Sequence, residues 1–166
     1  MDVGVIGVGV MGRNHVRVYS ELKSVNRLFV TDVNEKAASQ VAAANGAEVA
    51  TTVEALLPQV DAVSICVPTQ FHFGVATKVL LSGVNTFIEK PLCGTAREAE
   101  ELVRVIPPDL TVGVGHIERF NPIVDEIRRM IRKPIYIDAK RHNPASARVT
   151  GSSVVEDLMI HDIDVR

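Results

Sequence analysis

The chain has 166 residues, of which 46% are hydrophobic, so it is long and apolar enough to form one folded domain and is not disordered in composition. A formal net charge of −2 gives no electrostatic reason to expect nucleic acid or a membrane surface as a partner. Two cysteines do not make a disulfide framework, and the N-terminus lacks the features of a signal peptide, so we expect a cytoplasmic protein.

Short β-rich runs alternate with amphipathic helical stretches along most of the chain. Strands are predicted at Val3–Ile6, Leu28–Thr31, Glu48–Ala50, Ala62–Val67, Thr86–Ile88 and Leu110–Val114. Helices are predicted at Met11–Glu21, Glu35–Asn45, Val53–Leu57, Phe71–Leu81 and Ala96–Val105. The first and fourth strands are almost entirely apolar, as is typical of parallel strands covered on both faces. The pattern predicts an α/β fold with a doubly wound parallel sheet.

Helix starts and a second domain can be predicted further along the chain. Thr95 and Glu98 form a T-x-x-E capping box. Asn121 before Pro122 indicates another helix start, with the cap followed by proline at the first helical position. An alternating strand is then expected at Ile135–Lys140, a loop at 145–153 and a helix at 154–166. We therefore divide the chain into a doubly wound domain, 1–118, for which the glycine-rich motif described next predicts a Rossmann dinucleotide site, and an incomplete piece of a second α/β domain, 119–166.

A glycine-rich motif follows the first strand and opens the first helix. Residues 7–12 read G-V-G-V-M-G, and Asp32 stands 20 residues further on, at the end of the second strand. This context is that of a Rossmann dinucleotide site, in which the glycines allow a tight turn, close approach to the pyrophosphate and close helix packing. The predicted cofactor-binding residues here are Gly7, Gly9, Val10, Met11, Gly12 and Asp32.

The carboxylate of Asp32 also bears on the choice of cofactor. It can accept hydrogen bonds from both ribose hydroxyls and would repel a 2′-phosphate, which favours NAD over NADP. Lys36 leaves NADP open as the less favoured cofactor. The alternative interpretation is that the glycines serve packing alone and that Asp32 caps the next helix.

Three further motifs occur in order along the chain. They are P-T at 68–69 with His72 after it, E-K-P at 89–91, and G-H-I-E-R-F-N-P at 115–122. Together they resemble the glucose–fructose oxidoreductase and inositol dehydrogenase (Gfo/Idh/MocA) family, over the whole chain. The last motif is most similar to the family's UDP-N-acetylglucosamine 3-dehydrogenase type, so the resemblance implies a sugar or nucleotide-sugar substrate.

The resemblance also implies catalytic residues. The lysine of E-K-P, here Lys90, belongs to the active site of family members, which often have a cis peptide before Pro91. Asp157 and His161 match an aspartate and a histidine that the family carries four residues apart on a helix. His161 would act as general base for a sugar hydroxyl, and Lys90 would stabilise the charge on its oxygen. These two roles can also be exchanged.

Other polar residues receive lesser roles. Cofactor contacts are also expected from Pro68, Thr69, His72, Glu89 and Lys90, and substrate contacts from Lys90, His116 and His161. His15 and His142 are interpreted as surface or capping residues. We find no His or Cys cluster with the spacing of metal ligands and expect no metal.

Family members continue beyond residue 166 into a second domain that forms part of the substrate pocket and often an oligomer interface. We therefore expect a fragment of a homo-oligomer; a short gene and a protein completed by a partner are the alternatives. Two rival functions remain open. One is a dinucleotide-binding regulatory module without chemistry, and the other is a reductase of the same fold that acts on an imine or a linear aldehyde.

Overall fold

A computed structural model describes residues 1–131, 133, 135, 136, 138, 140, 155 and 159–164. The chain divides into two compact units, Met1–Val114 and Gly115–Arg166, called unit 1 and unit 2 below. Each unit is described by itself. None of the helices in the described part of the chain is long and apolar enough to cross a membrane.

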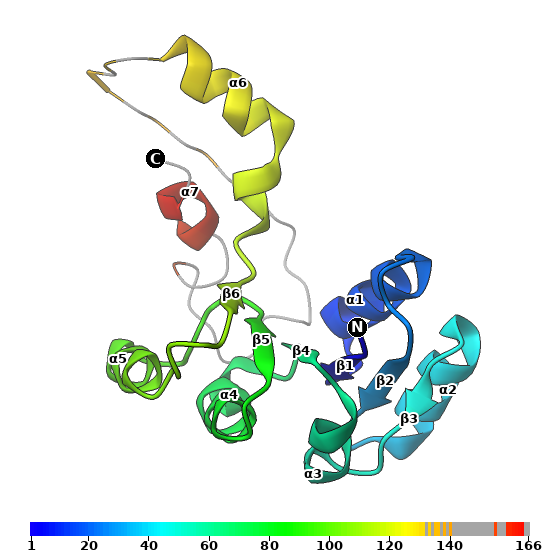
Figure 1. The fold of residues 1–166 in the computed structure, drawn as a ribbon. Coiled ribbons are helices and arrows are strands. Elements are labelled where there is room, and N and C mark those ends of the chain that lie inside the picture. Colours follow the sequence, from blue (N-terminus) through cyan, green and yellow to red (C-terminus); the bar gives the residue numbers. More distant parts are fainter. Residues whose placement is uncertain are drawn as a thin grey trace. The chain divides into compact units, whose positions relative to one another are not determined.

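Unit 1 is built on one parallel sheet of six strands (Figure 1). Its strands are β1 (Val3–Ile6), β2 (Leu28–Thr31), β3 (Glu48–Val49), β4 (Ala62–Ile65), β5 (Asn85–Ile88) and β6 (Val112–Val114). They lie in the order β3-β2-β1-β4-β5-β6, and every neighbouring pair is parallel. This confirms the predicted doubly wound parallel sheet, with strand ends within two residues of those expected.

Helices cover both faces of this sheet (Figure 1). They are α1 (Val10–Glu21), α2 (Glu35–Asn45), α3 (Val53–Leu56), α4 (His72–Leu81) and α5 (Ala96–Arg104), with short 3-10 turns at Leu57–Gln59 (η1) and Thr69–Phe71 (η2). Strand residues alternate between two core clusters: Val5 packs with Val16 of α1, whereas its neighbour Ile6 packs with Leu80 of α4. Successive side chains of a strand point to opposite faces, so both faces must be apolar when both are covered.

The ends of the helices follow local sequence signals. The Thr95 hydroxyl accepts the Glu98 N–H while the Glu98 carboxylate accepts the Thr95 N–H, which confirms the capping box. At the C-terminal end of a different helix, α2, Gly46 takes a φ of 66°, a left-handed conformation that glycine adopts without a steric penalty.

Unit 2 contains a 3-10 turn, η3 (Ile117–Phe120), and the helices α6 (Pro122–Met130) and α7 (Ile160–Asp164). The Asn121 side chain accepts the Ile123 N–H, as expected of the predicted cap. The strand predicted at Ile135–Lys140 is wrong for its described residues, 135, 136, 138 and 140, which lie outside any strand. A strand requires a neighbouring strand for its hydrogen bonds, and the described part of unit 2 offers none. Residues 141–154 lie outside the described part.

Candidate functional site

The candidate site lies at the carboxyl edge of the sheet in unit 1. The strand order reverses between β1 and β4, which are hydrogen-bonded neighbours, and α/β sheets bind ligands beyond the strand ends at such a point. The loop after β1 touches the loop after β4, since a Cβ on Gly7 would lie 2.9 Å from the backbone of Cys66 and Val67. Gly7 also has a φ of 90°, so glycine is required there for both reasons.

Gly9 and Gly12 differ in what surrounds them. A Cβ on Gly12 would lie 1.9 Å from the Gly7 carbonyl oxygen, so this glycine lets α1 pack against the strand. A Cβ on Gly9 would meet nothing within 4 Å. Gly9 is also the N-cap of α1, and no side chain caps that helix. An exposed glycine beside a helix N-terminus without a capping side chain is a cradle that fits a pyrophosphate.

Asp32 holds the glycine-rich loop from the end of β2. Its Oδ2 accepts the Val8 N–H at 2.7 Å, and its Oδ1 accepts the Asn34 N–H at 2.8 Å. The cap of α2 is Asn34, which accepts the Ala37 N–H, so the alternative that Asp32 caps this helix is wrong. Each carboxylate oxygen has a second lone pair, which leaves Asp32 able to accept from two ribose hydroxyls.

Lys90 is the second residue after β5, at the same edge of the sheet. The Lys90–Pro91 peptide bond is cis, as the family resemblance implied. The preceding carboxylate, Glu89, is buried, with 6% of the residue exposed. Its Oε2 accepts the Lys90 N–H at 3.2 Å, and its Oε1 lies 2.8 Å from Nε2 of His15. Glu89 therefore binds groups of the protein itself, and its predicted cofactor contact stays a prediction.

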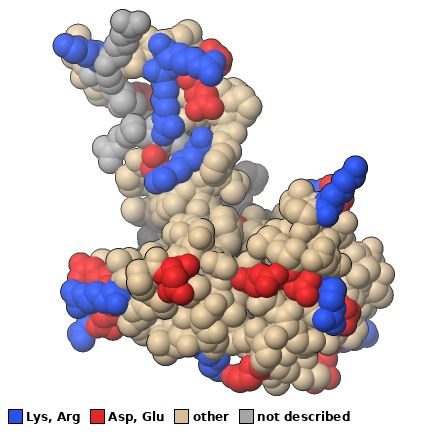
Figure 2. All heavy atoms as spheres, viewed as in Figure 1, with Lys and Arg blue, Asp and Glu red and all other residues tan. Residues whose placement is uncertain are grey.

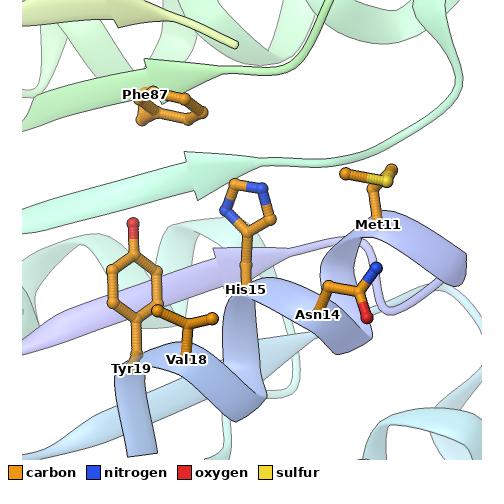
Figure 3. A pocket seen from close by; sticks show the side chains of 6 residues that line it. All are labelled: Met11, Asn14, His15, Val18, Tyr19 and Phe87. Atoms are coloured by element: carbon orange, nitrogen blue, oxygen red, sulfur yellow. The ribbon is translucent and has the colours of Figure 1, made fainter. Parts of the chain in front are cut away.

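The interpretation of His15 as a surface or capping residue is wrong. Its side chain is only 15% exposed and points from α1 toward β5, where its ring packs 5.5 Å from that of Phe87 (Figure 3). Nδ1 lies 3.1 Å from Ser64 Oγ, which is also 2.7 Å from the Tyr19 hydroxyl. The available signal was the position of His15, one turn into α1. Its partner Glu89 is 74 residues away, so local reasoning did not find the pair.

Ser64, His15 and Glu89 have the connectivity of a Ser–His–acid triad, but this group cannot act as a hydrolase. Ser64 is 0% exposed, and its oxygen is shared between His15 and Tyr19. An attacking hydroxyl must reach a substrate carbon, which a fully buried serine cannot do. An open hollow of about 280 Å³ lies beside the group, lined by Met11, Asn14, His15, Val18, Tyr19 and Phe87 (Figure 3).

His72 connects the loops after β4 and β5. Its ring is 1% exposed, with Nδ1 2.9 Å from the Pro91 carbonyl oxygen and Nε2 2.8 Å from that of Val67. Thr69 opens η2 and is partly buried, whereas Pro68 before it is exposed. The predicted cofactor contacts of these residues are untested, but the side chain of His72 is engaged by backbone on both sides.

In unit 2, one carboxylate links α7 to η3. Asp164 accepts two hydrogen bonds from Arg119, at 2.7 and 2.5 Å, and these hold the pKa of Asp164 below its usual value. His116, the residue before η3, has Nδ1 3.7 Å from the same carboxylate. His161 lies on α7 and is partly buried, whereas Asp157 lies outside the described residues. The predicted pairing of Asp157 with His161 stays a prediction.

Charge and metal-ligand patterns add no further site. On the face of unit 1 drawn in Figure 2, basic side chains lie beside acidic ones rather than in one basic field. Among the described residues, no group of three or more His, Cys, Asp or Glu side chains could hold a metal ion. The glycine-rich loop, Asp32 and Lys90 are therefore the residues considered for the proposed function below.

Comparison with known proteins agrees with this geometry. Residues 1–116 match the oxidoreductase family with an NAD-binding Rossmann fold, Gfo/Idh/MocA, and the chain belongs to that family. The UDP-N-acetylglucosamine 3-dehydrogenase of Acidithiobacillus ferrooxidans is 38% identical over 99% of this chain and 53% of its own. A crystal structure of that enzyme matches with a TM-score of 0.89, over 99% of this chain and 55% of the other.

Inositol dehydrogenases are more distant relatives. Inositol 2-dehydrogenase of Cereibacter sphaeroides is 29% identical over 99% of this chain and 52% of its own. The structure of myo-inositol dehydrogenase from Lactobacillus casei with NAD(H) and myo-inositol has a TM-score of 0.73 and 28% identity, over 78% of this chain and 40% of the other. The chain thus spans about half the length of the curated relatives that it matches.

Proposed function

We propose that the protein containing this chain is an NAD-dependent dehydrogenase that oxidises a hydroxyl group of a sugar or nucleotide sugar. The observation that carries the proposal is that three candidate site features lie along one edge of the sheet. The glycine-rich loop follows β1, Asp32 follows β2 and Lys90 follows β5, all at the carboxyl ends of parallel strands. The 38% identity to a UDP-N-acetylglucosamine 3-dehydrogenase supports a nucleotide sugar as the first substrate to test.

The residues of the chain have distinct roles in this reaction. His161, with Asp157 four residues before it in the sequence, takes the proton of the substrate hydroxyl as general base. Lys90 donates a hydrogen bond to the same oxygen and stabilises the negative charge that develops there. The exchange of these two roles is equally compatible with the chemistry. Nicotinamide, when bound, supplies the hydride acceptor.

NAD is the proposed cofactor, in preference to NADP. Asp32 is fixed by the Val8 and Asn34 N–H groups, so its negative charge cannot easily turn away from the adenosine ribose. A 2′-phosphate at that ribose would place two negative charges close together, which lowers affinity for NADP. Replacement of Asp32 by Ala should therefore reduce the difference in affinity between NAD and NADP.

Compartment and assembly belong to the same proposal. Cys66 and Cys93 are both free thiols, which fits the reducing cytoplasm. Helix α6 exposes several large apolar side chains in unit 2, namely Ile123, Ile127 and Met130, and contacts between copies would cover such a surface. We therefore propose a homo-oligomer, which light scattering on the full-length protein tests.

The experiment is a turnover assay on the protein at its full natural length. UDP-N-acetylglucosamine and myo-inositol are each offered with NAD and with NADP, and reduced cofactor is followed by absorbance. We expect turnover of a sugar with NAD, loss of that turnover in Lys90→Ala, and NAD affinity within about twofold of wild type in the variant. Turnover that survives Lys90→Ala contradicts the assignment. NAD binding without turnover of any sugar or carbonyl substrate would make the protein a binding module.

A further inference from the structure

The helix of His15, α1, begins at the glycine-rich loop, but the His15 side chain contacts the loop after β5 that contains Lys90, residues 89–91, called the lysine loop below. Its Nε2 is 2.8 Å from Glu89 Oε1, and the other oxygen of Glu89 accepts the Lys90 N–H at 3.2 Å. One buried carboxylate thus joins α1 to the backbone of the lysine that follows β5. We propose that His15 is a positioning residue for Lys90 that acts through Glu89; this inference rests on the proposed function of Lys90.

The burial of the pair gives the first argument. Glu89 is 6% exposed, and a buried carboxylate is stable only when hydrogen-bond donors replace the water that it has lost. The His15 ring and the Lys90 N–H are two such donors to Glu89. Removal of the His15 donor leaves Glu89 to find another partner. A rotation of the carboxylate toward another partner would break its bond to the Lys90 N–H, and the lysine backbone would lose that support.

The second argument concerns how firmly His15 itself is held. An ionised carboxylate only accepts, so Nε2 carries the proton in the bond to Glu89, and Nδ1 then accepts from Ser64. Ser64 in turn can accept from the Tyr19 hydroxyl at 2.7 Å. The contact with the Phe87 ring fixes the plane of the imidazole (Figure 3). In this arrangement Tyr19 donates to Ser64, Ser64 donates to His15, and His15 donates to Glu89. The network therefore holds the Glu89 carboxylate in one orientation.

The third argument is that Lys90 requires such support. It lies after the last residue of β5, and a displacement of about 1 Å at a catalytic group can reduce the rate by about a hundredfold. On its C-terminal side, the Pro91 carbonyl oxygen is held by His72. On its N-terminal side, the corresponding contact is the bond from the Lys90 N–H to Glu89. His15 and His72 thus hold the lysine loop from its two ends.

The test compares two replacements of His15 in the full-length protein. In His15→Gln the amide nitrogen can stand where Nε2 stood and still donate to Glu89. In His15→Asn the shorter side chain reaches the position of Nδ1 near Ser64 and not Glu89. Both lose the contact of the ring with Phe87, so they are matched in packing. Tyr19→Phe removes a hydroxyl that contacts Ser64 and not His15, so the Ser64 bond to His15 and the His15 bond to Glu89 both remain, and this variant serves as the control.

Two readouts decide the outcome. The first is kcat with a sugar and NAD: we expect His15→Asn to lose about tenfold or more, His15→Gln to stay within about threefold of wild type, and Tyr19→Phe within about twofold, with NAD affinity unchanged in all three. The second is the rate at which an amine reagent acetylates Lys90, measured by mass spectrometry against the exposed Lys36. We expect labelling of Lys90 to accelerate about threefold or more in His15→Asn and not in His15→Gln.

Equal labelling of Lys90 in the Asn and Gln variants overturns the proposal, as does a wild-type kcat in His15→Asn. A merely structural role would lower the melting temperature of both variants alike without separating them in either readout. If the wild-type protein turns over no sugar, the proposed function fails. The labelling comparison still decides whether His15 positions Lys90, because it does not depend on turnover.

Discussion

Unit 1 and unit 2 differ in how they bury their apolar residues. In unit 1, two clusters on opposite faces of the sheet enclose strand and helix side chains that are almost fully buried. In the described part of unit 2, no residue of α6 or α7 is buried, and Phe120 of η3 is 85% exposed. The first unit therefore has the core of a complete domain. The second unit exposes apolar side chains, and surfaces of this composition are usually covered by contacts with other protein segments.

The largest expected effect of a substitution follows from this difference. Leu80 on α4 is 0% exposed, whereas Phe120, whose side chain is at least as large, is 85% exposed. We expect Leu80→Ala to lower the free energy of unfolding of unit 1 by about 3 kcal/mol, and Phe120→Ala by less than about 0.5 kcal/mol. Denaturant unfolding of this chain measures both. Similar losses in the two variants would contradict the contrast between the units.

A smaller loss is expected within the glycine-rich loop. Gly12→Ala places a methyl group 1.9 Å from the Gly7 carbonyl oxygen, so α1 must move, and we expect destabilisation of about 2 kcal/mol. Gly9→Ala is the matched control, because its methyl group meets nothing within 4 Å and the backbone there is extended. Thermal unfolding should shift in the first variant alone. Equal shifts would show that Gly9 also serves packing.

Acid should weaken the contact between α7 and η3 in unit 2. The pKa of Asp164 is lowered by its hydrogen bonds from Arg119, so the pair stabilises the fold fully above the unfolded pKa of about 3.9 and loses that contribution as pH falls through the lower, folded pKa. We expect the protection factors of the α7 amides, which are corrected for the intrinsic pH dependence of exchange, to be the same at pH 7 and 5 and lower at pH 3. The control is Asp164→Asn, in which this change with pH should disappear.

The smallest effect on stability is expected where only the chemical reactivity of a side chain is probed and no residue is replaced. Burial, aided by the negative charge of Glu89, raises the pKa of Cys66 to about 12. At pH 8 its thiolate fraction is then about a thousandfold below that of an ordinary cysteine, and alkylation should be slower by a similar factor. Mass spectrometry after iodoacetamide treatment measures this rate, with the guanidinium-unfolded chain as control. Rapid labelling of the folded chain would show that the core of unit 1 opens readily.

Much of unit 1 could be predicted because its signals are local. The glycine-rich loop, the T-x-x-E box at Thr95 and the apolar strands each act within a few residues, and the structure confirms them. The buried contact of His15 could not be predicted in this way, because its partner Glu89 comes near it only once β5 pairs with β4. The strand at 135–140 was predicted from alternation alone, which specifies a face but cannot supply a hydrogen-bonding neighbour.

The most direct test of the cofactor site is a calorimetric titration of NAD into the chain, for wild type and Gly9→Ala. We propose that the open space at Gly9, beside the start of α1 that no side chain caps, takes the pyrophosphate. We predict that wild type binds one NAD and that Gly9→Ala, at wild-type thermal stability, loses affinity about tenfold or more. Wild-type affinity in Gly9→Ala would contradict the claim and place any dinucleotide elsewhere.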